Sequence, residues 1–177
     1  IYGAGFSLYE QGATALSMGG AFSAKADDAT AIFYNPAGIS QIEGTEISIG
    51  LSLIPPENEL HDPYGGHWET EDQDFLIPNL YIAHQLNDKI TLGLGVTAPF
   101  GLGMDWSGDE DFIYRYLVKE VAIESIYVLP VMSYKINDNW SIAGGPMYVK
   151  SEVEYEAAVD MTNVETALSA ALGFDVY

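Results

Sequence analysis

The sequence contains no cysteine and few basic residues, and these two features exclude several kinds of site and partner. Without cysteine it can form neither disulfides nor thiolate sites. Six Lys and Arg residues stand against 26 Asp and Glu residues, which gives a formal net charge of −20. Such an acidic surface repels phosphate, so we expect no nucleic-acid partner. The 177 residues suit one domain, and a hydrophobic content of 48% argues against a disordered chain.

The sequence also lacks an apolar run of the roughly 18 residues that a membrane-spanning helix needs. The longest candidate, Ile126 to Met132, is short and is interrupted by Pro130. A β-barrel crosses a bilayer with strands of about ten residues, so a membrane location stays open. No basic segment followed by an apolar stretch opens the chain, and we interpret it as a mature protein whose secretion signal has been removed.

Residues 1–43 are rich in Gly, Ala and Ser and show no sustained alternation. Asp27 or Asp28 could cap a short helix that runs to Phe33, because a carboxylate there accepts unpaired amide protons. Pro36 disfavours helical geometry at Asn35, so the helix should end there. Taken alone, an Asn-Pro dipeptide is only a common helix-ending turn.

Alternating polar and apolar residues then predict an antiparallel β structure of about five strands. The predicted strands are residues 46–53, 79–86, 89–97, 116–135 and 140–157. The first places Ile47, Ile49, Leu51 and Leu53 on one face, and the third does the same with Ile90, Leu92, Leu94 and Val96. The same alternation is typical of a soluble β-sandwich, which remains the structural alternative.

The connections between these strands alternate in length. Asn87-Asp88 and residues 136–139 predict tight turns, whereas residues 55–76 and 98–115 predict long acidic loops. Outer-membrane barrels show this asymmetry between periplasmic turns and outer loops. Residues 162–165 have the form of a capping box and predict a short helix that Gly173 ends.

Three stretches near the N-terminus resemble the start of FadL-type outer-membrane transporters of hydrophobic compounds. They are residues 5–12, residues 16–22, and residues 27–38, which read D-D-A-T-A-I-F-Y-N-P-A-G. The resemblance implies a transmembrane antiparallel β-barrel, with residues 1–43 as a plug of short helices inside it. Residues 44–177 would form the first five barrel strands, with acidic outer loops and a short loop helix. Small membrane barrels need at least about eight strands, so the remaining strands must come from elsewhere in the full protein.

The resemblance also implies a function, namely passive uptake of long-chain fatty acids or alkyl aromatics across the bacterial outer membrane. The expected partners are the hydrophobic ligand and outer-membrane lipid. By position in the family, Phe6, Asn35, Pro36 and Ala37 line the ligand path. Pro99, Phe100 and Gly101 form a lateral opening, although Pro99 could equally end a strand at the membrane edge. Arg115 is the candidate contact for a carboxylate head group, with a surface ion pair to residues 109–111 as the alternative.

No catalytic motif is present, and we expect neither an enzyme nor a cofactor. His61 and His67 could join Asp62 or Glu69 around a cation, but a solvated acidic loop is the interpretation that we favour, and we predict no metal site. The alternative function is a surface barrel whose acidic loops bind a partner or divalent cations, with no role in transport.

Overall fold

The computed structural model describes residues 7–9, 11–108 and 112–158, which are mostly β-strand. Three short helices come first: α1 (Ala13–Ser17), α2 (Ala31–Tyr34) and the 3-10 helix η1 (Pro36–Gln41). The strands are β1 (Thr45–Ile54), β2 (Glu59–His61), β3 (His67–Glu69), β4 (Phe75–Asn87), β5 (Ile90–Thr97), β6 (Gly101–Asp105), β7 (Glu120–Asn137), β8 (Trp140–Gly144) and β9 (Tyr148–Glu156). None of the described helices is long and apolar enough to cross a membrane.

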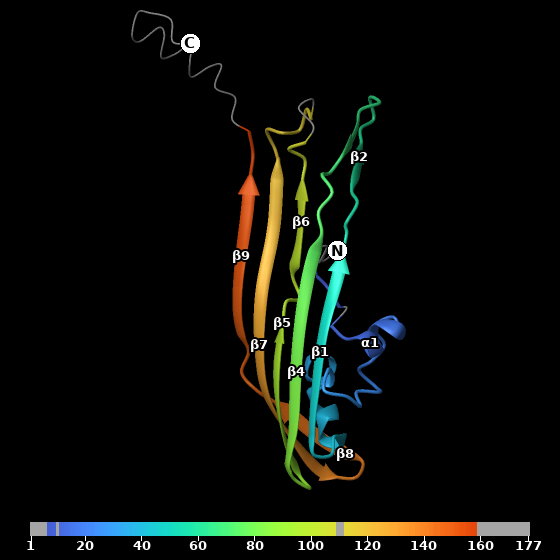
Figure 1. Ribbon diagram of the computed structural model, residues 1–177, viewed down its shortest axis with the longest axis vertical. Helices are drawn as coiled ribbons and strands as arrows, with labels where there is room; N and C mark the ends of the chain where they lie inside the picture. The colour runs from blue at the N-terminus through green and yellow to red at the C-terminus, as the bar shows by residue number, and fades with distance from the viewer. Residues whose placement is uncertain (1–6, 10, 109–111, 159–177) are drawn as a thin grey trace, which may run out of the picture. The chain divides into compact units, whose positions relative to one another are not determined.

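Seven of these strands form one sheet in the order β1-β4-β5-β7-β6, with β8 and β9 also paired to β7 (Figure 1). The pairs β1–β4, β4–β5, β5–β7 and β7–β8 are antiparallel. The strands β2 and β3 pair only with each other. The predicted antiparallel architecture with short leading helices is therefore confirmed.

The chain divides into two compact units. The first comprises residues 1–56, 72–103 and 123–153, and the second comprises residues 57–71, 104–122 and 154–177. The first holds the N-terminal helices and most of the large sheet, and the second holds the β2–β3 hairpin.

Both predicted tight turns are present, and asparagine side chains stabilise them. Asn87 Oδ1 accepts hydrogen bonds from the amides of Lys89 and Ile90, both at 3.0 Å. Asn137 Oδ1 accepts from Asn139 and Trp140, both at 2.9 Å. Such side-chain bonds mimic a backbone turn and fix the register of the strands on either side.

Three predictions about strands and loops are wrong. One is the long loop at residues 98–115, which contains the strand β6. Residues 140–157 form two strands rather than one, because Pro146 has no amide proton for the ladder and the chain breaks between β8 and β9. The predicted loop at 55–76 contains the three-residue strands β2 and β3, whose alternation is too short to recognise. Residues 162–173, where a loop helix was predicted, lie outside the described residues.

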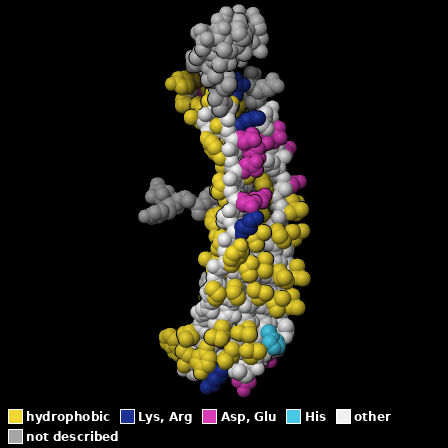
Figure 2. Space-filling model, turned by 90° about the vertical axis from the view of Figure 1, so that its left-hand side faces the viewer, with side chains coloured by type: hydrophobic (Ala, Val, Ile, Leu, Met, Phe, Trp, Pro, Cys, Tyr) yellow, Lys and Arg dark blue, Asp and Glu magenta, His cyan; other side chains and the backbone are white. Residues whose placement is uncertain are grey.

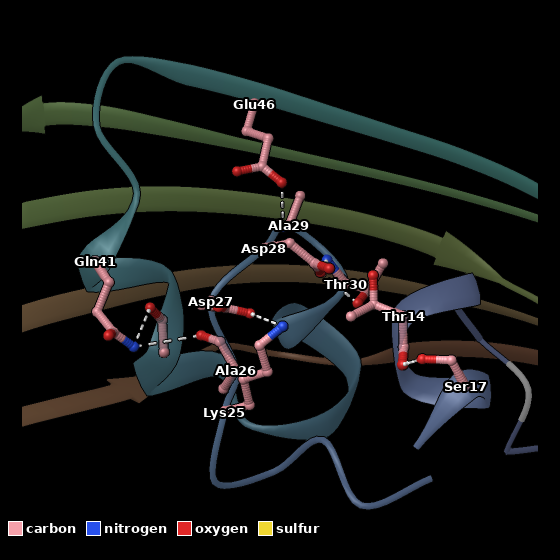
Figure 3. Close-up of polar contacts among 11 residues, drawn as sticks. Thr14, Ser17, Lys25, Ala26, Asp27, Asp28, Ala29, Thr30, Gln41 and Glu46 are labelled. Atoms are coloured by element: carbon pink, nitrogen blue, oxygen red, sulfur yellow. Dashed lines mark hydrogen bonds and ion pairs between the residues drawn. The ribbon is translucent and has the colours of Figure 1, made fainter. Parts of the chain in front are cut away.

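The helix predicted before Asn35 exists but begins later than expected. α2 starts at Ala31 and ends at Tyr34, and Pro36 opens η1, so the predicted stop at Asn35 is confirmed. Neither Asp27 nor Asp28 is the N-cap residue, which is Thr30. Asp28 Oδ1 instead accepts from the Thr30 amide at 2.8 Å and from its hydroxyl at 2.5 Å (Figure 3).

The first unit exposes the apolar face of its sheet. On β1, Ile47, Ile49, Leu51 and Leu53 are 60 to 79% exposed, whereas the residues between them are half-buried. Leu92 and Leu94 of β5 are also exposed, and Thr91 and Thr97 of the same strand are buried. Figure 2 shows hydrophobic side chains gathered over much of the face in view. A sheet whose apolar face is left exposed is typical of the wall of a membrane β-barrel, where that face contacts lipid.

The N-terminal segment, residues 7–9 and 11–42, packs on the other face of that sheet (Figure 1). Its Phe22, Ile32 and Ile39 are buried together with Tyr81 and Ala83 of β4. Two glycines allow this close approach: a Cβ at Gly93 would lie 2.9 Å from Ile32, and one at Gly95 would lie 3.0 Å from it. Polar bonds add to the packing, since Glu46 of β1 accepts from the Ala29 amide at 2.9 Å (Figure 3).

Candidate functional site

The strand order contains an interruption at residues 98–100. β5 ends at Thr97 and β6 begins at Gly101, and both pair with β7. Pro99 has no amide proton to donate to a ladder, which explains why pairing stops there. Pro99 and Phe100, two residues of the predicted lateral opening, lie in this interruption, whereas Gly101 already belongs to β6.

The start of the N-terminal segment is bound to this interruption. The Leu8 amide donates to the Pro99 carbonyl at 2.8 Å, and Ser7 and Phe100 form an antiparallel bridge. Gln11 is completely buried, and its side-chain oxygen accepts a hydrogen bond from the Thr97 hydroxyl. A segment from the start of the chain thus supplies hydrogen bonds at the place where β5 stops.

Ser125 on β7 also forms hydrogen bonds with the backbone at the interruption. Its amide donates to the Phe100 carbonyl at 2.7 Å, and its hydroxyl accepts from the Phe100 amide at 3.1 Å. The ring of Phe100 lies against Tyr127, with the ring centres 6.4 Å apart. The backbone at the interruption is therefore held by β7 as well as by the N-terminal segment.

An apolar cavity of about 350 Å³ lies beside the interruption. Its lining residues are Ile49, Gly50, Pro78, Asn79, Leu80, Val96, Thr97, Ala98 and Ile126. Gly50, Asn79 and Thr97 are paired in one row across β1, β4 and β5. Asn79 is 4% exposed, and its amide oxygen has no hydrogen-bond partner among the described residues. The cavity therefore combines outward-facing apolar side chains with two buried polar residues, Asn79 and Thr97.

The Asn35-Pro36-Ala37 turn is fixed to other parts of the first unit. The Asn35 side-chain Nδ2 donates to the Ser23 carbonyl at 2.9 Å. The Ala37 carbonyl accepts from the hydroxyls of Ser133 on β7, at 3.3 Å, and Ser141 on β8, at 3.1 Å. Among the described residues that line the cavity, none belongs to this turn. The structure gives the turn an anchoring position and does not bring it to the cavity.

The remaining predicted residues lie elsewhere. Phe6 lies outside the described residues. Arg115 belongs to the second unit, is exposed, and places its guanidinium 5.3 Å from the centre of the Tyr116 ring. Its backbone accepts a hydrogen bond from the Ala158 amide at 2.8 Å.

Sequence reasoning missed Gln11, Asn79 and Ser125. Gln11 and Ser125 are ordinary polar residues in sequence, and only the fold shows that they meet residues 97–100. Asn79 was assigned to a predicted strand, but its pairing with Gly50 was not foreseeable. A Cβ at Gly50 would lie 2.6 Å from the Asn79 amide oxygen, so this glycine makes room for that side chain.

An antiparallel wall with an exposed apolar face, covered on its other face by the N-terminal segment, defines a membrane β-barrel protein. The family model described as "Outer membrane protein transport protein (OMPP1/FadL/TodX)" matches residues 2–174. The chain therefore belongs to this family and is a protein of the bacterial outer membrane. The family description is that of a transport protein, which agrees with the expectation that the chain is not an enzyme.

Individual relatives agree with the family assignment. The chain is 29% identical over 127 residues to an outer membrane protein of Neisseria meningitidis serogroup B, covering 62% of this chain and 26% of that one. It is 25% identical over 167 residues to a long-chain fatty acid transport protein of Escherichia coli, covering 86% of this chain and 36% of that one. The curated relatives it matches are thus much longer than the chain.

A solved structure shows the same fold. The crystal structure of a Pseudomonas aeruginosa FadL homologue superposes with a TM-score of 0.54 at 20% sequence identity. The match covers 71% of this chain and 33% of that chain. The open sheet is accordingly part of a barrel wall.

Proposed function

We propose that the full protein admits hydrophobic compounds passively across the outer membrane and releases them sideways through the barrel wall at residues 98–100. The observation that carries this proposal is the coincidence of three features: an interrupted strand, an apolar cavity of about 350 Å³ beside it, and an N-terminal segment bound to it. Family membership supports the transport role.

The cavity suits an apolar ligand because burial of each methylene stabilises a complex by about 0.8 kcal/mol. A ligand that reaches the interruption leaves into lipid past Ile49, Leu80 and Val96, which face outward, and avoids a polar lumen. No energy source is needed, because the ligand moves down its gradient.

In this proposal, residues 1–43 act as a plug, and its residues Ser7, Leu8 and Gln11 close the interruption. The bonds from Leu8 to Pro99 and from Thr97 to Gln11 hold the closed state. A ligand that displaces this segment opens the path, with Phe6 on the path just before the segment. Asn35, Pro36 and Ala37 keep the rest of the plug in place while its first residues move.

The proposal includes two substrate classes, fatty acids and neutral alkyl aromatics. The chain carries only six basic residues, and Arg115 is the candidate to bind a carboxylate. If fatty acids are the substrate, Arg115→Gln should lower fatty-acid uptake and leave uptake of a neutral alkyl aromatic unchanged. Equal effects on both compounds would remove Arg115 from this role.

A disulfide lock tests the gating step directly, and these 177 residues contribute no cysteine of their own that could compete. Ser7 and Phe100 are antiparallel bridge partners, so cysteines at these two positions lie within the range that a disulfide spans. We expect the oxidised S7C/F100C protein to assemble normally, to stop uptake of a hydrophobic probe, and to recover on reduction.

The matched control places the same cross-link away from the interruption. Thr45 and His84 are paired on β1 and β4, and a T45C/H84C disulfide should leave uptake unchanged. Uptake at the wild-type rate by the fully oxidised S7C/F100C protein would overturn the gating proposal.

Replacement of the anchoring turn tests the plug. Asn35→Ala removes the bond to the Ser23 carbonyl, and we expect lower uptake from a barrel that still assembles. Unchanged uptake by the correctly assembled variant would contradict a role for this turn.

A further inference from the structure

The β2–β3 hairpin of the second unit places four potential metal ligands on one of its faces. His61 pairs directly with His67, and Glu59 pairs directly with Glu69. Because side chains alternate along a strand, these four residues share a face, which we call the ligand face. Leu60 and Trp68, the pair between them, share the opposite face.

The side chains of the ligand face already lie close together. The two imidazole rings are stacked, with centres 4.4 Å apart and planes 3° apart. Glu59 Oε2 lies 3.1 Å from His61 Nε2 and 3.7 Å from His67 Nε2. Glu69 Oε1 lies 3.6 Å from His67 Nε2. One ligand atom from each of Glu59, His61 and His67 falls within 4.8 Å of the others.

The hairpin beneath this face is well supported. Trp68 is 8% exposed and packs with its ring centre 5.9 Å from that of Phe112 and 5.7 Å from that of Tyr114. A Cβ at Gly66 would lie 2.1 Å from the Trp68 ring, so glycine is required for this packing. The turn is also closed, because Asp62 Oδ1 accepts from the amides of Tyr64, at 2.8 Å, and Gly66, at 2.7 Å.

These bonds change the cation site considered from the sequence, in which His61 and His67 were combined with Asp62 or Glu69. The Asp62 carboxylate serves the turn, and Glu59, which sequence reasoning had not considered, lies nearest to both histidines. Exposed contacts of this kind contribute little to stability.

We propose that Glu59, His61, His67 and Glu69 bind one Zn²⁺ or a similar first-row transition metal ion. Imidazole nitrogen is a preferred ligand of such ions, and two imidazoles with carboxylate oxygens match known ligand sets. Ligand atoms around a tetrahedral Zn²⁺ lie about 3.3 Å apart, as follows from metal–ligand distances of about 2.0–2.1 Å. Modest rotation of exposed side chains closes the remaining distance. The proposal goes beyond transport and does not depend on it.

The two histidine ligands determine which metal ion binds and how its affinity depends on pH. Ca²⁺ and Mg²⁺ prefer oxygen ligands, so they should not compete at similar concentrations. The imidazoles must be neutral to bind the metal, and protons therefore compete for them. Affinity for the metal should therefore fall as the pH is lowered.

The experiment titrates the full-length, detergent-solubilised protein, stripped with a chelator, with Zn²⁺ in a calorimeter and with Co²⁺ followed by visible absorption. We expect one saturable equivalent, and a loss of affinity of at least about tenfold in His61→Ala, His67→Ala and Glu59→Gln, the lower end of what even outer-shell changes cost. His61 and His67 are exposed, so these variants should fold.

His84→Ala is the matched control, because His84 is also exposed but lies on β4, where its ring is bonded to the Thr45 hydroxyl at 2.7 Å. It should bind Zn²⁺ like the wild type. The proposal is overturned if no saturable binding occurs, if His61→Ala and His67→Ala bind as tightly as His84→Ala, or if Ca²⁺ displaces Zn²⁺ at equal concentration.

Discussion

The first unit and the β2–β3 hairpin of the second unit use the same alternation in opposite senses. In β1 the apolar side chains between Ile47 and Leu53 are exposed and the small or polar ones between them are half-buried. In the hairpin the charged side chains are exposed and Trp68 is buried. Alternation defines two faces of a strand but does not determine which of them is exposed. In water the polar face is exposed, and in a bilayer the apolar face is exposed. The difference indicates that the first unit faces hydrocarbon and the hairpin faces water.

The largest effect is expected at the aromatic cluster of the second unit. Trp68→Ala should cost about 3–5 kcal/mol, as for other buried tryptophans. Hydrogen exchange should then show lost protection over residues 58–70 while β4 and β5 keep theirs. Tyr64→Ala, at a 94% exposed position of the same hairpin, is the control and should change little. Equal loss in β4 and β5 would contradict the separation of the two units.

A charge on the exposed apolar face should be nearly as damaging. Ile49→Arg should destabilise the barrel by about 2–4 kcal/mol, the cost of a basic residue facing the bilayer midplane. Tyr64→Arg places the same side chain on the hairpin and should be close to neutral. Denaturant unfolding in detergent or lipid measures both. Equal stability of the two variants would show that β1 does not face hydrocarbon.

A smaller effect is expected where the N-terminal segment folds on itself. A Cβ at Gly38 would lie 2.2 Å from the Ala26 carbonyl oxygen, a backbone atom that cannot rotate away. Gly38→Ala should therefore cost about 1–3 kcal/mol through overpacking. Gly144→Ala has nothing within 4 Å of its new methyl group and is the control. Protease sensitivity of the N-terminal segment reports the difference, and equal sensitivity would argue against tight packing there.

The smallest predicted effect concerns the hydroxyls that hold Ala37. Ser141→Ala removes one of two bonds to this carbonyl and should cost about 0.5–1.5 kcal/mol. Ser151→Ala, at an exposed position on β9, should be neutral in the same unfolding assay. A larger loss of stability in Ser141→Ala than in Gly38→Ala would show that hydrogen bonding contributes more than packing in this region.

Much of the fold follows from local pattern in the sequence. Strict alternation located β1 and β5, and the asparagine turns at Asn87 and Asn137 located the two hairpins. The pairing of the N-terminal segment with the interruption was not predictable, because the Leu8–Pro99 and Gln11–Thr97 contacts join residues far apart in sequence. The hairpin face was missed because three-residue strands carry too little periodicity, and only pairing shows that His61 lies opposite His67.

The most direct test of the account is a comparison of neighbouring positions on β1. Spin labels on single cysteines at Ile49 and Ser48, in the full-length protein reconstituted in lipid, report relative access to oxygen in the bilayer and to a water-soluble nickel complex. The account predicts that the Ile49 label is exposed to lipid and protected from nickel, while the Ser48 label is shielded from lipid. Labels at both positions that are equally accessible to the nickel complex would contradict a lipid-facing wall.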